Sequence, residues 1–271
     1  MASMNNLQLL DEGGWRQGFT NLFYKENGEW RYTGRWWMQS LLWLLIMNGI
    51  LAIVLWVLPV MDPEGMSDVP KNFGLATFMA VMAKLPIYAV IVITQGVIIG
   101  EKQSGTAAWI LSAPVSRSGF ILSKLIANAI GFLGTIIILQ GLVAYVLISL
   151  SEGSLLPPGP YLSYLALLSL YLLFYLALTL MLGTFFNTRG PVLGITIGVA
   201  IWSMLGLGKL FFARFMPWLV LILPEALPDL VSASVQGGSM PATWPVSIIA
   251  MSLYTVLFVA LAIWRFNREE F

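Results

Sequence analysis

The stretch that decides the fold is WMQSLLWLLIMNGILAIVLWVLPV, residues 37–60, which contains no charged residue. A helix needs about 20 apolar residues to cross roughly 30 Å of hydrocarbon. This stretch is therefore long enough to span a bilayer. A secretory signal has a charged region next to a short apolar core and a small-residue cleavage site. About 35 mixed residues precede this stretch and Leu58-Pro59-Val60 ends it, so we expect the span to be retained.

The composition of the whole chain agrees with that stretch. Hydrophobic residues make up 58%, charged residues 10%, and the mean hydropathy is +0.83, whereas about 25% of residues are charged in an ordinary soluble domain. The chain has no His and no Cys, which excludes His general bases, thiolate catalysis and the usual zinc ligands. A net charge of +1 argues against a nucleic-acid surface. The composition therefore predicts an all-α integral membrane protein.

Six apolar runs are predicted to span the membrane. They are Trp37–Val60, Ala76–Gly100, Phe120–Leu150, Tyr161–Phe186, Pro191–Leu207 and Val246–Trp264. The predicted domains are a tail with an interfacial helix over 1–36, a six-span domain over 37–264 and a tail over 265–271. With an even number of spans, both termini lie on one side of the membrane.

The distribution of Lys and Arg assigns that side. The segments on the side of the termini hold ten of these residues, the opposite segments hold three, and Lys84 lies within a span. Positive residues concentrate in cytoplasmic loops. We therefore expect a multi-pass protein of the inner or plasma membrane with both termini in the cytoplasm.

Two segments outside the spans are too apolar for plain loops. Aromatic residues crowd 15–37, and Phe19, Leu22 and Phe23 recur at helical spacing. This pattern indicates a helix lying in the membrane interface, or an aromatic belt that anchors the first span. Between 208 and 244, Pro217, Pro224 and Pro228 interrupt an apolar stretch. Proline disfavours one continuous helix, so we expect short broken helices here; a seventh crossing over 210–223 is the alternative.

The loop GEKQSGTAAWILSAPVSRSGFILSKL, residues 100–125, carries the strongest functional signal. Ser104 or Thr106 can cap a short helix over 106–112, and Pro114 stops it. Ser116 or Ser118 can then cap the third span. The apolar face of so short a helix must lie on lipid, on the protein's own helix ends or in a groove of a cytoplasmic partner.

The same loop resembles the signature stretch of type-2 ABC export permeases. The resemblance is carried by Glu101-Lys102-x-x-Gly105-Thr106, by Leu111-Ser112-x-Pro114-Val115-Ser116-Arg117 and by Lys124-Leu125. The ending Trp264-Arg265-Phe266-Asn267-Arg268-Glu269 is similar to the family's apolar last span and short charged tail. The resemblance implies that the loop holds a coupling helix. The implied ATPase-coupling residues are Glu101, Lys102, Gly105, Thr106, Ala108, Trp109, Leu111, Pro114 and Arg117.

The resemblance also implies partners. Two permease chains, identical or related, would form a pathway in the lipid bilayer, and two cytoplasmic ABC ATPase subunits would dock on the coupling helices with ATP and Mg²⁺. The chain lacks the G-x-x-x-x-G-K-[ST] phosphate loop, so we expect no catalysis and no cofactor on this chain. The low intramembrane charge favours a hydrophobic or amphipathic substrate. The alternatives are a non-transporting scaffold subunit and an ATPase-independent secondary transporter.

Several residues inside the spans are further candidates. Gly190, Gly194 and Gly198 repeat at a small-xxx-small spacing that lets helices approach closely; this indicates a packing or dimer seam, or ordinary glycine enrichment. Lys84, Asn128 and Gln140 are candidate pathway residues. The alternatives are a Lys84 side chain that extends to the membrane surface and interhelical hydrogen bonds of the two amides. No metal site is expected.

Overall fold

The computed structural model describes residues 14–237 and 239–269, and their regular elements are helices, with no strand in this part of the chain. Five helices are long and apolar enough to cross a membrane. They are Arg35–Met61, Phe73–Gln103, Arg117–Glu152, Pro158–Phe185 and Trp244–Asn267. The chain is therefore all-helical, as predicted, and its long apolar helices are those of a multi-pass membrane protein.

The first three long helices are interrupted. The first consists of α2 (Arg35–Trp43), η2 (Leu44–Asn48), α3 (Gly49–Ala52), η3 (Ile53–Val57) and α4 (Leu58–Met61), where η2 and η3 are π-helical. The second consists of α6 (Phe73–Lys84), α7 (Pro86–Thr94) and α8 (Ile99–Gln103). The third consists of α10 (Arg117–Phe132), π-helical η4 (Leu133–Ile138) and α11 (Leu139–Glu152). Pro86 begins α7 just after α6 ends, and a break is expected there because proline lacks an N–H for the helical hydrogen-bond ladder.

The helix α12 (Pro158–Phe185) is the centre of the bundle. It packs against α7, α13 (Arg189–Met204), α16 (Ala226–Gly237) and α17 (Trp244–Asn267). In its most apolar stretch 72% of the residues are buried, against 22% in α17. A helix that is apolar on every side is typical of such a central position. The helix α17 instead turns apolar residues such as Leu253 and Val256 outward.

The predicted fifth span, Pro191–Leu207, corresponds to the helix α13 (Arg189–Met204), which is short for a membrane span. The helix α13 has 16 residues, about 24 Å at 1.5 Å per residue, which is less than the roughly 30 Å of a bilayer core. It ends where Gly206 takes a positive φ of 62°. The described residues therefore hold five long apolar helices, and a sixth crossing at α13 stays a prediction.

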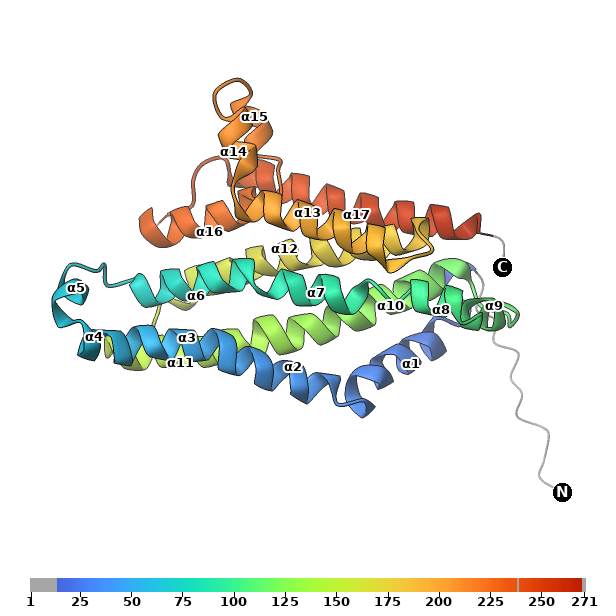
Figure 1. The fold of residues 1–271 in the computed structure, drawn as a ribbon, viewed down its shortest axis with the longest axis horizontal. Coiled ribbons are helices and arrows are strands. Elements are labelled where there is room, and N and C mark those ends of the chain that lie inside the picture. Colours follow the sequence, from blue (N-terminus) through green and yellow to red (C-terminus); the bar gives the residue numbers. More distant parts are fainter. Residues whose placement is uncertain (1–13, 238, 270–271) are drawn as a thin grey trace.

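The segment after α13 is broken, as predicted. It forms α14 (Leu207–Phe212), α15 (Pro217–Val220) and α16. The pair α14 and α15 projects sideways from the bundle (Figure 1). The alternative of a seventh crossing over 210–223 is wrong, because turns separate these short helices and Pro217 begins α15.

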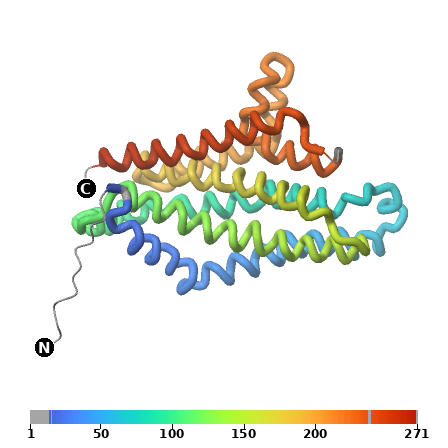
Figure 2. The backbone as a smooth tube through the Cα atoms, turned by 180° about the vertical axis from the view of Figure 1, so that it is seen from behind, coloured from blue at the N-terminus to red at the C-terminus, as the bar shows by residue number. Residues whose placement is uncertain are grey.

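One end of the bundle gathers segments that are distant in the sequence. The helices α1 (Phe19–Tyr32) and α9 (Thr106–Leu111) lie there with the end of α17 (Figures 1 and 2), and we call it the α9 end. The short helix α5 (Pro63–Ser67) lies at the opposite end. Gly34, with a φ of 76°, makes the turn from α1 into α2. The helix predicted after residue 15 is thus present, whereas residues 1–13 of the predicted tail lie outside the described residues.

Candidate functional site

The short helix α9 forms where the loop sequence predicts it. Its N-cap is Gly105 in the left-handed region (φ 72°), which glycine adopts without the cost that a side chain would bring. The N-cap residue is thus a glycine rather than a Ser or Thr, while Ser104 Oγ accepts the first-turn N–H of Thr106 at 3.4 Å. At the other end, Ser116 Oγ accepts the Gly119 N–H at 2.9 Å and begins α10, as predicted.

The helix α9 has one buried and one open side. Ala107 and Ile110 are buried, whereas Trp109 is 77% exposed. Pro114, just after the helix, is also exposed. An apolar ring this open at the end of a bundle is a candidate contact for another protein or for lipid.

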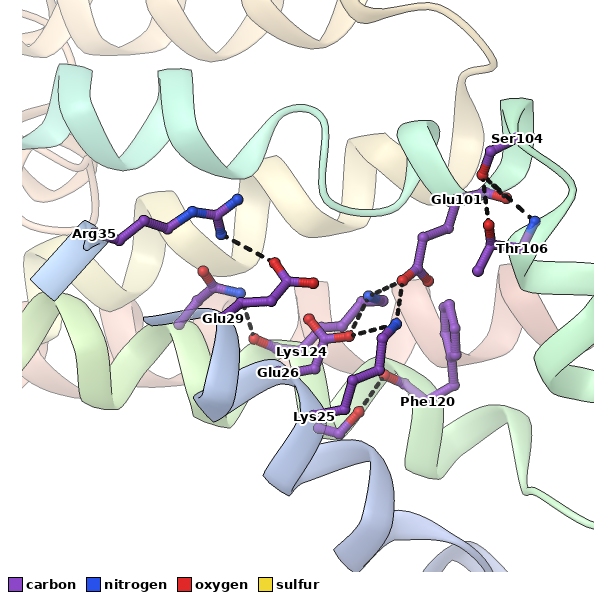
Figure 3. Close-up of polar contacts among 11 residues, drawn as sticks. Lys25, Glu26, Glu29, Arg35, Glu101, Ser104, Thr106, Phe120 and Lys124 are labelled. Carbon is purple, nitrogen blue, oxygen red and sulfur yellow. Dashed lines mark hydrogen bonds and ion pairs between the residues drawn. The ribbon is translucent and has the colours of Figure 1, made fainter. Parts of the chain in front are cut away.

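A cluster of charges fixes the chain just before α9 (Figure 3). Glu101 on α8 lies 3.0 Å from Lys124 on α10 and 2.9 Å from Lys25 on α1. Lys124 also lies 2.7 Å from Glu26 on α1. The side chains of Lys124 and Glu26 are 2% and 6% exposed. We call Lys25, Glu26, Glu101 and Lys124 the charge cluster; it joins α1, α8 and α10.

The charge cluster holds two cations against two carboxylates, so its formal charges balance. Removing one partner of a buried pair is costly because it leaves the other charge uncompensated. Burial alone would lower the pKa of Lys25, but its hydrogen bond to Glu101 and the nearby carboxylates outweigh burial and raise that pKa. Lys25 therefore stays protonated over the physiological pH range.

Apolar packing holds α1 in the same place. The ring of Trp30 lies on Gly131 of α10, where a Cβ would overlap it. Trp30 Nε1 donates to Asn128 Oδ1 at 3.3 Å, and its ring meets Phe132 edge-on at 4.9 Å between centroids. The start of α1 is tied to the turn after α9, because the Ser116 N–H donates to Gln17 O at 2.9 Å.

Lys102 and Arg117 connect the predicted coupling loop to the end of the chain. Lys102 Nζ lies 3.0 Å from Glu269 and donates to Thr184 O and to Asn187 Oδ1, each at 3.1 Å. Arg117 Nη1 donates to the carbonyls of Asn267 at 2.9 Å and Glu269 at 2.6 Å. A cation at a helix C-terminus satisfies carbonyls that have no partner within the helix. These two predicted coupling residues therefore hold the end of α17 in place.

A polar cavity of about 310 Å³ adjoins the charge cluster. Its lining includes three carboxylates, three cations and two amides: Glu26, Glu29, Glu101, Arg35, Lys124, Arg189, Gln95 and Asn128. The cavity is thus a charged depression at the α9 end. It brings Asn128, a predicted pathway residue, next to the predicted coupling residue Glu101.

The other predicted residues lie elsewhere. Gln140 is buried and donates to the carbonyls of Ser40 and Thr135 while accepting from Asn48 at 2.8 Å. These bonds join the first and third long helices, which is the alternative to a pathway role. Lys84 ends α6 and is exposed. The predicted glycine seam, Gly190, Gly194 and Gly198, is exposed, and a Cβ added at any of the three would meet no described atom within 4 Å, so no other helix of the described chain packs closely on it.

Sequence reasoning missed the members of the site that come from distant segments. Lys25 and Glu26 on α1 and Glu269 after α17 were not predicted as partners of the loop. Glu26 and Lys124 are 98 positions apart, and no local spacing relates them. The only signal was the presence of charges next to apolar helices, where an unpaired charge is costly.

The fold and site define a class: an all-helical multi-pass protein with a charged, tightly held α9 end. The chain belongs to the DUF2705 family, described as "Protein of unknown function", whose pattern matches residues 37–271. The match thus covers the chain after α1. No curated protein matches the chain.

Proposed function

We propose that this chain is the membrane-spanning subunit of an ATP-driven exporter and that α9 is the contact for a separate cytoplasmic ATPase subunit. The observation that carries the proposal is the exposed ring of Trp109 on a short helix beside a fixed charge cluster. Hydrophobic aromatic residues are frequent anchors at protein interfaces. The resemblance of residues 101–125 to the coupling stretch of type-2 export permeases agrees with this role.

The connections of α9 supply the mechanical part of the proposal. Glu101 ties the residues before α9 to α1 and α10, and Lys102 and Arg117 tie its two flanks to the end of α17. A displacement of α9 by a partner therefore acts on several long helices together. ATP binding to the partner shifts the equilibrium between two arrangements of these helices only by its differential affinity for them.

The outer face of α13 supports a pair of such chains. Gly190, Gly194 and Gly198 form an exposed stripe, and neighbouring Ile195 and Ile201 are 42% and 44% exposed. Small residues in that spacing allow close approach of a second helix. The proposed complex thus contains two membrane chains, either two copies of this chain or one copy and a related chain, in the plasma membrane. Two ATPase subunits bind these chains from the cytoplasm. Its substrate is hydrophobic or amphipathic.

Copurification tests the proposal. The tagged chain is isolated from native membranes in mild detergent, and the accompanying proteins are identified by mass and assayed for ATP hydrolysis. We expect a roughly stoichiometric ATP-binding subunit with the native chain, and its loss with Trp109→Asp or Gly105→Pro. Trp218→Asp is the matched control, because Trp218 is 61% exposed on α15, away from α9.

The result divides the alternatives. A folded chain that brings no nucleotide-binding subunit at any salt concentration contradicts the proposal and favours a secondary transporter. A bound ATPase that is unaffected by both changes in the loop contradicts the role of α9. Vesicle transport with and without the ATPase separates an exporter from a scaffold.

A further inference from the structure

A second cavity lies where α14 leaves the bundle, away from the α9 end (Figure 1). Its volume is about 310 Å³. The end of α6, the end of α13, the start of α14, the start of α16 and Tyr171 of α12 enclose it. Its polar and charged lining residues are Lys84, Tyr171, Ser203, Lys209, Glu225, Asp229 and Ser232.

Glu225 is the unusual member of this lining. It is 2% exposed, and its carboxylate faces backbone N–H groups at the start of α14 but forms no ion pair within the described part of the chain. The carboxylate lies against Gly208 at the first turn of α14, where any larger residue would overlap it. Burial raises the pKa of Glu225, and the neighbouring Asp229 raises it further, whereas the backbone N–H groups of Glu225, Gly208 and Lys209 offset part of that rise. A buried carboxylate without a cation is costly, so a cationic group in the cavity would relieve that cost.

The other polar groups of the cavity are mostly satisfied. Lys209 Nζ lies 2.7 Å from Asp229, and the Tyr171 and Ser203 hydroxyls lie 2.8 Å apart. Lys84 is exposed and forms no ion pair within the described residues. One carboxylate and one ammonium therefore remain available on the wall of a single cavity.

The surroundings of these two charges are apolar. Leu205 and Met204, which line the cavity, are 63% and 47% exposed, and Leu85 next to Lys84 is 38% exposed. Exposed apolar side chains beside a charged cavity suit a ligand with both a polar headgroup and a hydrocarbon part.

We propose that this cavity binds the headgroup of a zwitterionic amphipath, with the ligand's ammonium on Glu225 and its anionic group near Lys84. The inference goes beyond the proposed function, because binding at this cavity requires no ATPase. If the chain is an exporter, the bound amphipath would be its substrate. A failure to find an ATPase partner leaves this binding site in place.

A purely structural role for Glu225 is the competing explanation. Its carboxylate lies at the start of α14, where negative charge is favourable for a helix, and Lys84 has a long side chain that can reach toward it. If Glu225 only stabilises the start of α14 or attracts Lys84, removal of its charge would weaken the local fold without changing any ligand preference. The test must therefore measure preference as well as stability.

The experiment uses the purified full-length chain in non-ionic detergent and two lysolipids with a fluorophore on the acyl chain. Lysophosphatidylethanolamine carries an ammonium and a phosphate, whereas lysophosphatidylglycerol carries the phosphate alone. We expect the native chain to bind the ethanolamine lipid about tenfold more tightly, as is usual when a buried charged hydrogen bond is gained. Glu225→Gln, which keeps the side-chain volume, should remove this preference.

Two further variants complete the design. Lys84→Met should weaken the binding of both lipids and keep the preference for ethanolamine, because the phosphate is common to both. Asp68→Asn, on an exposed residue outside the cavity, should leave both affinities unchanged. Equal affinities of the native chain for the two lipids, no binding of either, or an unchanged preference in Glu225→Gln would overturn the proposal. The comparison in the native chain decides the matter even where a variant fails to fold.

Discussion

The carboxylate of Glu101 and the ammonium of Lys124 lie 3.0 Å apart, with Lys124 only 2% exposed. Glu101 lies in α8, near the end of the second long helix and just before α9, and Lys124 is in the second turn of the third long helix. This contact, shared with Glu26 and Lys25 of α1, converts the loop between two long helices into a fixed corner. The position of α9 therefore depends on a buried charge pair rather than on the loop alone.

Replacement of Lys124 by Met should destabilise the chain strongly. The change leaves two carboxylates, Glu26 and Glu101, with the half-exposed Lys25 as their one remaining cation in the cluster, and loss of one partner of a buried ion pair costs about 3–5 kcal/mol. Thermal unfolding in detergent should show a clear drop in Tm. The control is Arg35→Met, because the Arg35–Glu29 pair is about 40% exposed on both sides and such pairs contribute about 0–1 kcal/mol. Equal losses in the two variants would contradict the account of the charge cluster.

Replacement of Gly131 by Leu should displace Trp30 from α10. The ring of Trp30 occupies the space that the new side chain needs, and overpacking costs about 1–3 kcal/mol. We expect a lower Tm and faster proteolysis in α1. Gly134→Leu is the matched control, since a Cβ at Gly134 meets no other atom within 4 Å. A Gly131→Leu protein with native stability and an unchanged proteolytic pattern would show that α1 is not held there.

Replacement of Arg117 by Ala should loosen the last turn of α17. The carbonyls of Asn267 and Glu269 lose their charged donor. A hydrogen bond to a charged group contributes about 1.5–3 kcal/mol to stability. Hydrogen exchange should become faster at the C-terminal end of α17. Arg268→Ala, which removes a contact with the Trp264 ring at 4.4 Å, should change exchange much less. Slow exchange in both variants would argue against the role of Arg117.

The contribution of Lys25 should depend on pH in one direction. The folded-state pKa of Lys25 is raised above its ordinary value, which is about 10.4. Its stabilisation is therefore fully present below about pH 10.4 and is lost as the pH rises through the folded-state pKa. Because Lys25 is 43% exposed, we expect Lys25→Met to cost at most about 1 kcal/mol. The difference between the native and variant unfolding free energies should stay constant from pH 7 to about pH 10 and shrink as the pH rises above about 10.4; a difference that grows with pH would be contrary to this assignment.

The helices could be predicted from the sequence because a membrane span depends on the composition of residues that are neighbours in the chain. The uncharged run over 37–60 and the break at Pro86 both follow from the composition of a few neighbouring residues. The helix α13 was predicted to span because the run Pro191–Leu207 is apolar. Gly206, whose positive φ separates α13 from α14, is a typical glycine stop signal after a helix, and the prediction did not use it.

Only the part of the site that lies within the loop over residues 100–125 could be predicted from the sequence. The loop sequence indicated α9 and the cap at Ser116, whereas the exposure of Trp109 came from the structure. The partners of that loop come from α1 and from the C-terminal end, and the buried carboxylate of Glu225 comes from a segment that reads as a broken apolar stretch. Such contacts depend on how the helices pack against one another, and the spacing of neighbouring residues in the sequence does not predict that packing.

The most direct test of the central claim is site-specific cross-linking from α9 in native membranes. In one variant a photo-reactive phenylalanine replaces Trp109. In a separate control variant the same residue replaces Trp218. We predict that position 109, and not position 218, forms an adduct with an ATP-hydrolysing protein, and that the adduct is identified by mass. An intact, membrane-inserted chain whose position 109 cross-links only to lipid, or to no ATP-binding protein, would contradict the account.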